Sequence, residues 1–263
     1  MRPLIYIMTP VLILTILLAA RFVTWDAIRG EDQQAQIYVQ DGTASLRSWK
    51  LRQAIKAFTR AIEIEPRYAE AYVKRGLAYY RSAQYKRAIA DYTQTLKLNR
   101  YQADAYASRG DAYQSLGDMQ RAIEDYSASL KRRRNPHVIQ KRADTYFRQG
   151  DVQKALADYD ALIKRKPTAM AYYGRGNVYL QLSVEDNKNR LQLALADLDQ
   201  AIALEPRFAS AYISRVEVHS QLGNRTLASR DTRHASKLLV EVLDKQIIQS
   251  LIIEIVRKYI NTL

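Results

Sequence analysis

The sequence has 263 residues, of which 48% are hydrophobic, and it contains no cysteine. The absence of thiols excludes disulfides, cysteine nucleophiles and cysteine-based metal sites. Lysine and arginine number 41 against 27 acidic residues, so the formal net charge is +14 at pH 7 and the location of the excess cations needs an explanation.

The first stretch, residues 3–20, contains no charged side chain and lies between Arg2 and Arg21. A helix of about 17 residues rises roughly 25 Å, and its continuation to Trp25 matches a hydrocarbon core about 30 Å thick. Tryptophan is typical of the membrane interface, and an arginine can extend its charge out of the span. We therefore expect a transmembrane signal-anchor helix over residues 3–25.

A cleaved signal peptide is the alternative interpretation of this segment. It is disfavoured because cleavage after Ala20 would place Leu18 at a position where a small residue is preferred. Residues 26–34 are expected to be a polar linker that keeps the following domain close to the bilayer. The expected localisation is a membrane with a single-pass N-terminal anchor, and the side that carries the domain stays open.

From residue 35 onward the sequence repeats with a period close to 34 residues. In the second copy, Tyr72, Gly76 and Tyr79 are spaced as one face of a helix, and Ala88 and Tyr92 belong to the same face of a second helix. A fixed period of this length predicts stacked helical hairpins, an α-solenoid. The six predicted repeats start at residues 35, 69, 103, 136, 169 and 209.

Repeat positions are counted from each of these starts, leaving out six extra residues that fall within 183–190 of the fifth repeat. Position eight is a glycine in four repeats, position twenty is always alanine, and position twenty-four is aromatic in four. Small residues allow the two helices to approach, and the aromatic rings fill the remaining space. The insertion is interpreted as a tolerated loop, with a protruding contact loop as the alternative.

The motifs RGLAY at residues 75–79 and AIADY at 88–92 resemble those of the tetratricopeptide repeat family. The resemblance covers residues 35–240. It implies an all-α, right-handed superhelix of helix pairs, preceded here by the N-terminal transmembrane helix, and a concave face that holds a peptide or a helix of a partner protein.

The family geometry places repeat positions two, five, six, nine, twelve and thirteen on the concave face. The carboxylate clamp of heat-shock co-chaperones in this family is not reproduced, which argues against chaperone tails as the ligand. The residues expected to bind the partner are Val39, Val73, Lys74, Leu77, Tyr80, Arg81, Lys141, Asp144, Phe147, Arg148, Tyr173, Asn177 and Leu180.

Arginine at position seven and aspartate at position twenty-three recur together in repeats two to six. The two positions are equally far from the turn at position fifteen, so antiparallel helices place them side by side. The interpretation is a structural ion pair; an arginine ladder for an anionic ligand is the alternative, disfavoured because the acids would neutralise it. The predicted pairs are Arg75 with Asp91, Arg109 with Asp125, Arg142 with Asp158, Arg175 with Asp197, and Arg215 with Asp231.

The turns that follow repeats two, three and four are rich in cations and contain no acid. Stacking would bring these turns onto one basic edge facing an anionic surface, in the first place lipid head groups. An acidic patch of a partner is the next alternative, and nucleic acid is third because no aromatic residues are interleaved. The edge comprises Lys97, Arg100, Lys131, Arg132, Arg133, Arg134, Lys164, Arg165 and Lys166.

The final segment, residues 241–263, has a wide apolar stripe that includes Leu243, Ile247, Leu251 and Ile255. It is expected to form a helix that caps the last hairpin, and the width of the stripe leaves open a further contact with a second copy or another partner.

No catalytic, metal or cofactor site is expected, because the three histidines have no partner at ligand spacing and no glycine-rich phosphate loop is present. The expected function is a membrane-anchored, non-catalytic scaffold that binds a protein partner through its concave face and assembles a complex. The alternatives are a basic-edge binder of an anionic lipid surface or nucleic acid, and a permanently packed subunit of a larger membrane complex.

Overall fold

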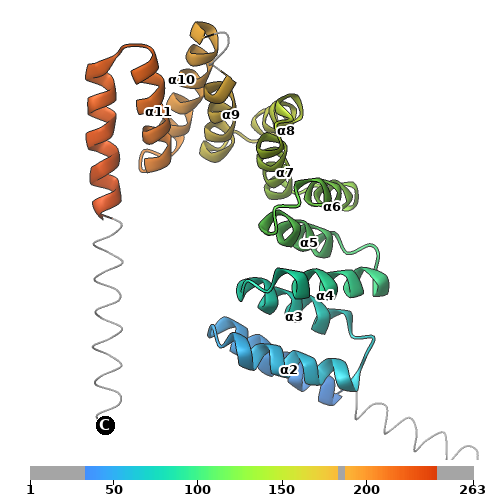
Figure 1. Cartoon of the computed structure of the whole chain (residues 1–263). Coiled ribbons are helices and arrows are strands. Elements are labelled where there is room, and N and C mark those ends of the chain that lie inside the picture. Colours follow the sequence, from blue (N-terminus) through green and yellow to red (C-terminus); the bar gives the residue numbers. More distant parts are fainter. Residues whose placement is uncertain (1–32, 183–186, 242–263) are drawn as a thin grey trace, which may run out of the picture. The chain divides into compact units, whose positions relative to one another are not determined.

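The computed structural model describes residues 33–182 and 187–241, which form consecutive helices joined by short turns (Figure 1). The chain divides into two compact units, unit 1 up to Arg133 and unit 2 from Arg134, and each is described by itself.

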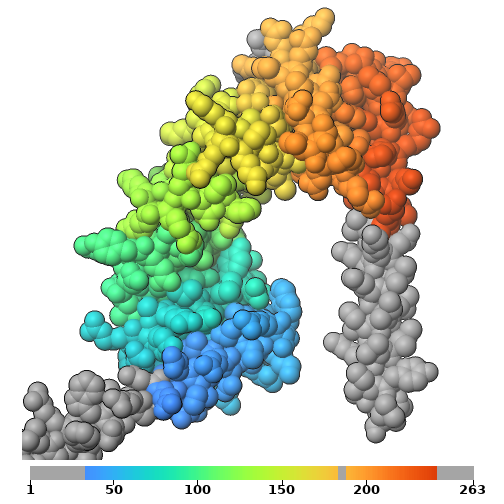
Figure 2. Space-filling model, turned by 180° about the vertical axis from the view of Figure 1, so that it is seen from behind, coloured from blue at the N-terminus to red at the C-terminus, as the bar shows by residue number. Residues whose placement is uncertain are grey.

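Unit 1 contains three helical hairpins in chain order. Within it, each helix packs on the next, and in the space-filling view the blue, cyan and green segments follow one another without interleaving (Figure 2). Each hairpin therefore buries its apolar faces against its neighbours in the sequence. The helices cover residues 33–47, α2 (Leu51–Ile64), α3 (Ala69–Arg81), α4 (Tyr85–Leu98), α5 (Ala103–Ser115) and α6 (Met119–Arg132).

Unit 2 repeats this arrangement. α7 pairs with α8, α9 with α10, and α11 with the helix over residues 225–241, whose described part ends at Glu241. The helices are α7 (Pro136–Gln149), α8 (Val152–Arg165), α9 (Ala169–Leu182), α10 (Asn187–Leu204), α11 (Ala209–Gln221) and the helix over residues 225–241.

The turn inside a hairpin has a left-handed residue at repeat position fifteen. Gly117, Gly150 and Gly223 occupy it with φ of 83°, 89° and 76°. Only glycine adopts this conformation without strain, and this explains why the first helix of these hairpins ends there. Trp49 and Ala83 occupy the same position with φ of 56° and 57°, so both carry backbone strain.

The aromatic ring at position twenty-four lies directly on the glycine at position eight. A Cβ atom on Gly110 would lie 2.8 Å from Cε1 of Tyr126, and one on Gly76 would lie 2.8 Å from Cε1 of Tyr92. Both tyrosine rings are at most 1% exposed. Glycine at position eight is therefore required by the ring that faces it.

The expected membrane localisation is wrong. Within the parts of the chain that the structure describes, no helix combines the length and the apolar surface needed to cross a membrane. The predicted anchor 3–25, nearly all of the linker 26–34 and residues 242–263, with the suggested homodimer contact, lie outside the described residues.

Candidate functional site

The structure brings together the five predicted Arg–Asp pairs. In the pair of α5 and α6, Arg109 donates from Nε to Oδ2 and from Nη2 to Oδ1 of Asp125, both at 2.8 Å. The other four pairs have the same two-pronged geometry with distances of 2.7 to 2.8 Å. Each pair links the two helices of one hairpin.

A third contact, which the sequence analysis missed, links neighbouring hairpins. Nη1 of Arg75 donates to Oγ1 of Thr59 at 3.2 Å, and Nη1 of Arg109 donates to Oγ1 of Thr93 at 3.1 Å. In unit 2 the acceptor is a carboxylate, Asp160 for Arg175 at 2.5 Å and Asp199 for Arg215 at 2.7 Å. All four acceptors lie at repeat position twenty-five. Its residue type changes along the chain, and this hides the pattern.

Tyrosine rings flank the same arginines. The guanidinium carbon of Arg75 lies 5.6 Å from the ring centroid of Tyr72 and 5.8 Å from that of Tyr79. These rings, at positions four and eleven, are half-buried, unlike the fully buried ring at position twenty-four. Their spacing in the repeat predicts packing alone, whereas in the structure they also shield a cation.

The aspartates of the ladder are buried, with side-chain exposure of 5% to 13%. Hydrogen bonds from Arg109 to Asp125 raise the pKa of Arg109 above its ordinary value, because they stabilise the charged form. A charge that is compensated inside each hairpin is not available to an external anion. The arrangement therefore favours a structural role for the ladder.

The first helices of the hairpins carry the predicted partner-binding residues, here called the first-helix surface. In unit 1, Arg81 is exposed, while Val73, Lys74, Leu77 and Tyr80 are half-buried. The assignment of Val39 to the partner-binding surface is corrected by the structure. Val39 is only 4% exposed, because it packs in the core cluster that contains Phe58.

The exposed tryptophan Trp49 lies at one end of this surface, and the sequence analysis did not predict its role. The guanidinium carbon of Arg81 lies 5.2 Å from its ring centroid, and Nη1 of Arg81 donates to the backbone oxygen of Leu46 at 3.4 Å. Tyr80 directly precedes Arg81, and the centroid of its ring lies 5.5 Å from that of Tyr85. Trp49 is 68% exposed. The sequence feature that indicates it is its place at the turn position, where three other hairpins have glycine.

The neighbouring helix α5 extends the first-helix surface of unit 1 with polar side chains. Oδ1 of Asp111 accepts from the hydroxyl of Tyr126 at 2.8 Å, and the hydroxyl of Ser115 lies 3.3 Å from that of Tyr80. Asp111 and Ser115 occupy positions nine and thirteen, which the family geometry indicates, although the sequence analysis did not select them.

In unit 2 the surface is formed by α7 and α9. Arg148 is exposed, and the other predicted residues are half-buried. The carboxylate of Asp144 accepts a hydrogen bond from the hydroxyl of Tyr159. Burial raises the pKa of Asp144 above its ordinary value. Asp144 is therefore engaged within the hairpin, which leaves cations as the more available charges of this surface. The half-buried residues are Lys141, Asp144, Phe147, Tyr173, Asn177 and Leu180.

The predicted basic edge is exposed throughout, but three of its arginines have partners in unit 1. Arg100 donates from Nη2 to the hydroxyl of Tyr101 at 2.7 Å. Arg132 donates to the backbone oxygens of Arg100 and Ala128, both at 2.8 Å, and lies over the ring of Tyr106. Arg133 forms an ion pair with Asp104. The turn after α6 therefore lies against the turn after α4, and part of its charge is used to hold them together.

No group of three or more histidine, aspartate or glutamate side chains that could hold a metal ion occurs in residues 33–182 and 187–241.

Comparisons with known proteins agree with this geometry. A sequence profile described as "TPR repeat" matches residues 50–82, and one described as "Tetratricopeptide repeat" matches residues 73–137 and 141–187. No curated protein sequence matches the chain. The repeats predicted to start at residues 35 and 209 lie partly or wholly outside the matched ranges, so the number six stays a prediction.

Solved structures that are similar in fold include the following three. YrrB, described as a TPR protein with an unusual peptide-binding site, is 21% identical with a TM-score of 0.60, and the match covers 72% of this chain and 96% of that one. A tetratricopeptide repeat protein from Parabacteroides merdae is 17% identical with a TM-score of 0.68, covering 78% and 80%. PilF from Pseudomonas aeruginosa is 15% identical with a TM-score of 0.65, covering 84% and 99%.

The profile matches, taken together, span about half of the sequence, and the solved structures share the arrangement of helices. Proteins with this fold are typically non-catalytic scaffolds for protein interactions, and some of them bind peptides. The chain belongs to the tetratricopeptide repeat family.

Proposed function

We propose that this protein is a non-catalytic scaffold that binds a segment of a partner protein on its first-helix surfaces. The observation that carries the proposal is Trp49, a large aromatic residue that is 68% exposed, stacked on Arg81 and held at φ 56°. A bulky residue in the left-handed region costs about 1 to 2 kcal/mol. Strain of this kind is concentrated at functional sites.

The composition around Trp49 is that of an interaction hot spot. Tryptophan, tyrosine and arginine contribute most to binding in protein interfaces, and Trp49, Tyr80 and Arg81 supply all three. In unit 2, Phe147 and Tyr173 supply aromatic side chains. YrrB, which shares the fold, is described as having a peptide-binding site, so this arrangement of helices is able to hold a peptide.

The charges indicate the kind of segment that fits. Arg81 and Arg148 are exposed, whereas Lys74 pairs with Glu70 at 3.3 Å and the carboxylate of Asp144 is bonded to Tyr159. A segment with apolar side chains and at least one carboxylate complements these surfaces. Such a segment is a peptide or a helix of the partner protein.

The test compares two glycine variants of the full chain. Trp49→Gly removes the strain and the ring together, and Ala83→Gly removes the same strain at the equivalent turn of the next hairpin. Relief of about 1 to 2 kcal/mol offsets the lost cation–π contact of about 0.5 to 1 kcal/mol, so Trp49→Gly should unfold within about 1 kcal/mol of wild type.

Quantitative mass spectrometry then compares proteins captured from an extract of the source organism. Proteins enriched on wild type and on Ala83→Gly should be lost on Trp49→Gly and on the triple alanine variant of Tyr80, Phe147 and Tyr173. If both of these variants capture the same proteins as wild type, the first-helix surfaces are not the binding site.

A further inference from the structure

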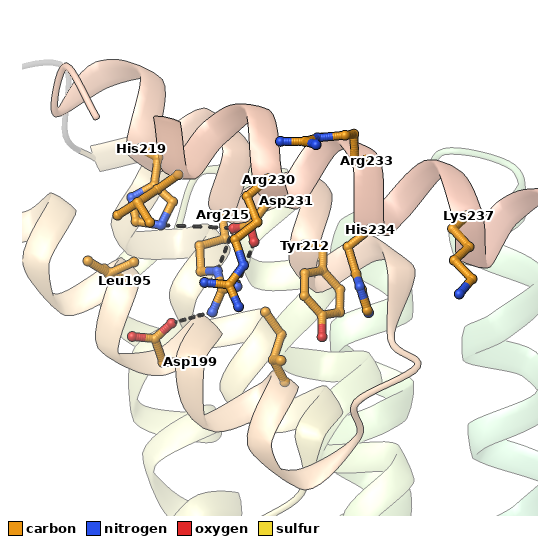
Figure 3. A pocket seen from close by; sticks show the side chains of 12 residues that line it. Leu195, Asp199, Tyr212, Arg215, His219, Arg230, Asp231, Arg233, His234 and Lys237 are labelled. Carbon is orange, nitrogen blue, oxygen red and sulfur yellow. Dashed lines mark hydrogen bonds and ion pairs between the residues drawn. The ribbon is translucent and has the colours of Figure 1, made fainter. Parts of the chain in front are cut away.

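The last described hairpin contains a cavity that the partner-binding proposal does not use. It lies between α10, α11 and the helix over residues 225–241, and its volume is about 850 Å³ (Figure 3). Cavities of this size are typical of small-molecule sites. The lining residues are Leu195, Asp199, Ile202, Tyr212, Arg215, His219, Leu227, Arg230, Asp231, Arg233, His234 and Lys237.

The cavity lies where two positions of the last described hairpin differ from those of the second, third and fourth hairpins. At position eleven, Tyr113 and Tyr146 lie between the guanidinium of position seven and a cation of position nineteen, Arg121 for Tyr113 and Lys154 for Tyr146. In the last hairpin position eleven is His219 and position nineteen is Leu227. The smaller ring leaves space that a tyrosine would fill.

His219 itself lacks a partner on one side. Its side chain is 8% exposed, its Nε2 lies 3.9 Å from Oδ2 of Asp231, and its Nδ1 forms no hydrogen bond with any described residue. A buried polar atom without a partner is costly, and such atoms are rare in folded proteins. A ligand in the cavity that can accept or donate a hydrogen bond would provide the missing partner.

The other polar groups make the cavity cationic. Asp199 and Asp231 are both bonded to Arg215, so two carboxylates outweigh one guanidinium and the positive charge of the cavity comes from the other three cations. Arg230, Arg233 and Lys237 are exposed, and none of the three has an ion pair within the described residues. Their spacing of i, i+3 and i+7 places them on one face of the helix.

The remaining lining is apolar and aromatic. Leu195, Ile202 and Leu227 contribute aliphatic surface, and the rings of Tyr212 and His234 lie 4.5 Å apart between centroids, side by side in Figure 3. The ligand should therefore have an anionic head and an apolar or aromatic body. Arginine forks match phosphate oxygens, and near neutral pH a phosphate monoester both accepts and donates hydrogen bonds.

We propose that this cavity binds a small organic phosphate, with the phosphate at Arg230, Arg233 and Lys237 and the organic body against the apolar lining. The test is isothermal titration of the full-length protein with phenyl phosphate, inorganic phosphate and phenol. Phenyl phosphate should bind at least about tenfold more tightly than either fragment, because only it contacts both parts of the cavity.

Two variants and a control locate the site. His219→Tyr restores the residue of the earlier hairpins and should abolish binding of phenyl phosphate while the melting temperature is kept or raised. Arg230→Gln combined with Arg233→Gln should weaken binding at least about tenfold, because each arginine contributes charge-assisted hydrogen bonds. Arg225→Gln, an exposed position on the same helix outside the cavity, should leave it unchanged.

The proposal is overturned if His219→Tyr binds phenyl phosphate as wild type does. It is also overturned if the Arg225→Gln control and the double arginine variant lose affinity equally, since that would indicate general charge attraction. A wild-type protein that binds none of the three probes rejects it as well.

Discussion

Arg109 is the side chain whose removal tests the Arg–Asp ladder most directly. It makes two hydrogen bonds of 2.8 Å to Asp125 and one of 3.1 Å to Thr93, so it joins two helices and two hairpins. Arg109→Ala leaves the carboxylate of Asp125, whose side chain is 7% exposed, buried without its counter-ion.

The loss of stability expected for Arg109→Ala follows from this burial. Breaking a fully buried pair costs about 3 to 5 kcal/mol, whereas exposed pairs contribute about 0 to 1 kcal/mol. The side chain of Arg109 is 18% exposed, so water reaches the vacated site and reduces the penalty. We expect Arg109→Ala to lower the free energy of unfolding by about 1 to 3 kcal/mol. Adding Asp125→Ala should recover part of the loss, because no orphan charge then remains.

Urea unfolding followed by circular dichroism at 222 nm measures the three variants against wild type. The Arg121 and Asp118 pair of the same hairpin is the control, since Arg121 is exposed and the pair is local in sequence. Its double-mutant cycle should show no measurable coupling. A coupling energy of zero between Arg109 and Asp125 would refute the structural role of the ladder.

Two further changes test the packing and the electrostatics of the hairpins. Gly110→Ala should lower stability by about 1 to 3 kcal/mol in the same urea assay, because the new Cβ would lie 2.8 Å from Tyr126 and 3.2 Å from the backbone oxygen of Ala122; an unchanged midpoint would contradict the close contact. Asp144→Asn should raise the melting temperature at pH 7. Burial raises the folded-state pKa of Asp144, so its stabilising contribution is fully present below the unfolded pKa and is lost as pH rises through the folded pKa. The difference should shrink toward about pH 3, where both side chains are neutral, and a lower melting temperature at pH 7 would contradict the sign.

Much of the fold could be predicted because the distance of a residue from its turn fixes which residue faces it across the hairpin. Arg109 and Asp125 lie equally far from their turn, so an antiparallel hairpin must place them together. The same reasoning covered Gly110 and Tyr126, a small residue facing a large one. In the fourth hairpin it was incomplete: Ala143 holds position eight, and the ring of Tyr159 lies against Gly174 of the next hairpin. Contacts within a hairpin follow from spacing alone, whereas contacts between hairpins depend on how the ring tilts.

The candidate interaction surface was less predictable for a related reason. Repeat position identifies which side of a helix a residue occupies, but it does not say what that residue already binds. Val39 is on a predicted surface position and is buried, and Asp144 is on one and is bonded to Tyr159. Trp49 is the opposite case, a residue of the proposed binding surface that was not predicted. Its proposed role rests on its exposure and on a backbone conformation that the sequence does not display.

The last described hairpin departs from the pattern at position twenty-five, and this departure connects the ladder with the cavity. In four earlier hairpins this position accepts a hydrogen bond from the arginine of the hairpin that follows, through Thr59, Thr93, Asp160 or Asp199. In the helix over residues 225–241 it is Arg233, a donor with no acceptor capacity.

A further hairpin of the same type, stacked on this helix, would place its own position-seven arginine against Arg233. Two guanidinium groups in contact would repel each other, and neither could accept a hydrogen bond from the other. The substitution that disfavours continued stacking thus also leaves an uncompensated cation beside the cavity opened by His219. An anion bound there would restore the charge balance that Asp160 and Asp199 provide in the preceding hairpins. The chemistry of the repeat therefore predicts that the ligand of the cavity carries a negative charge.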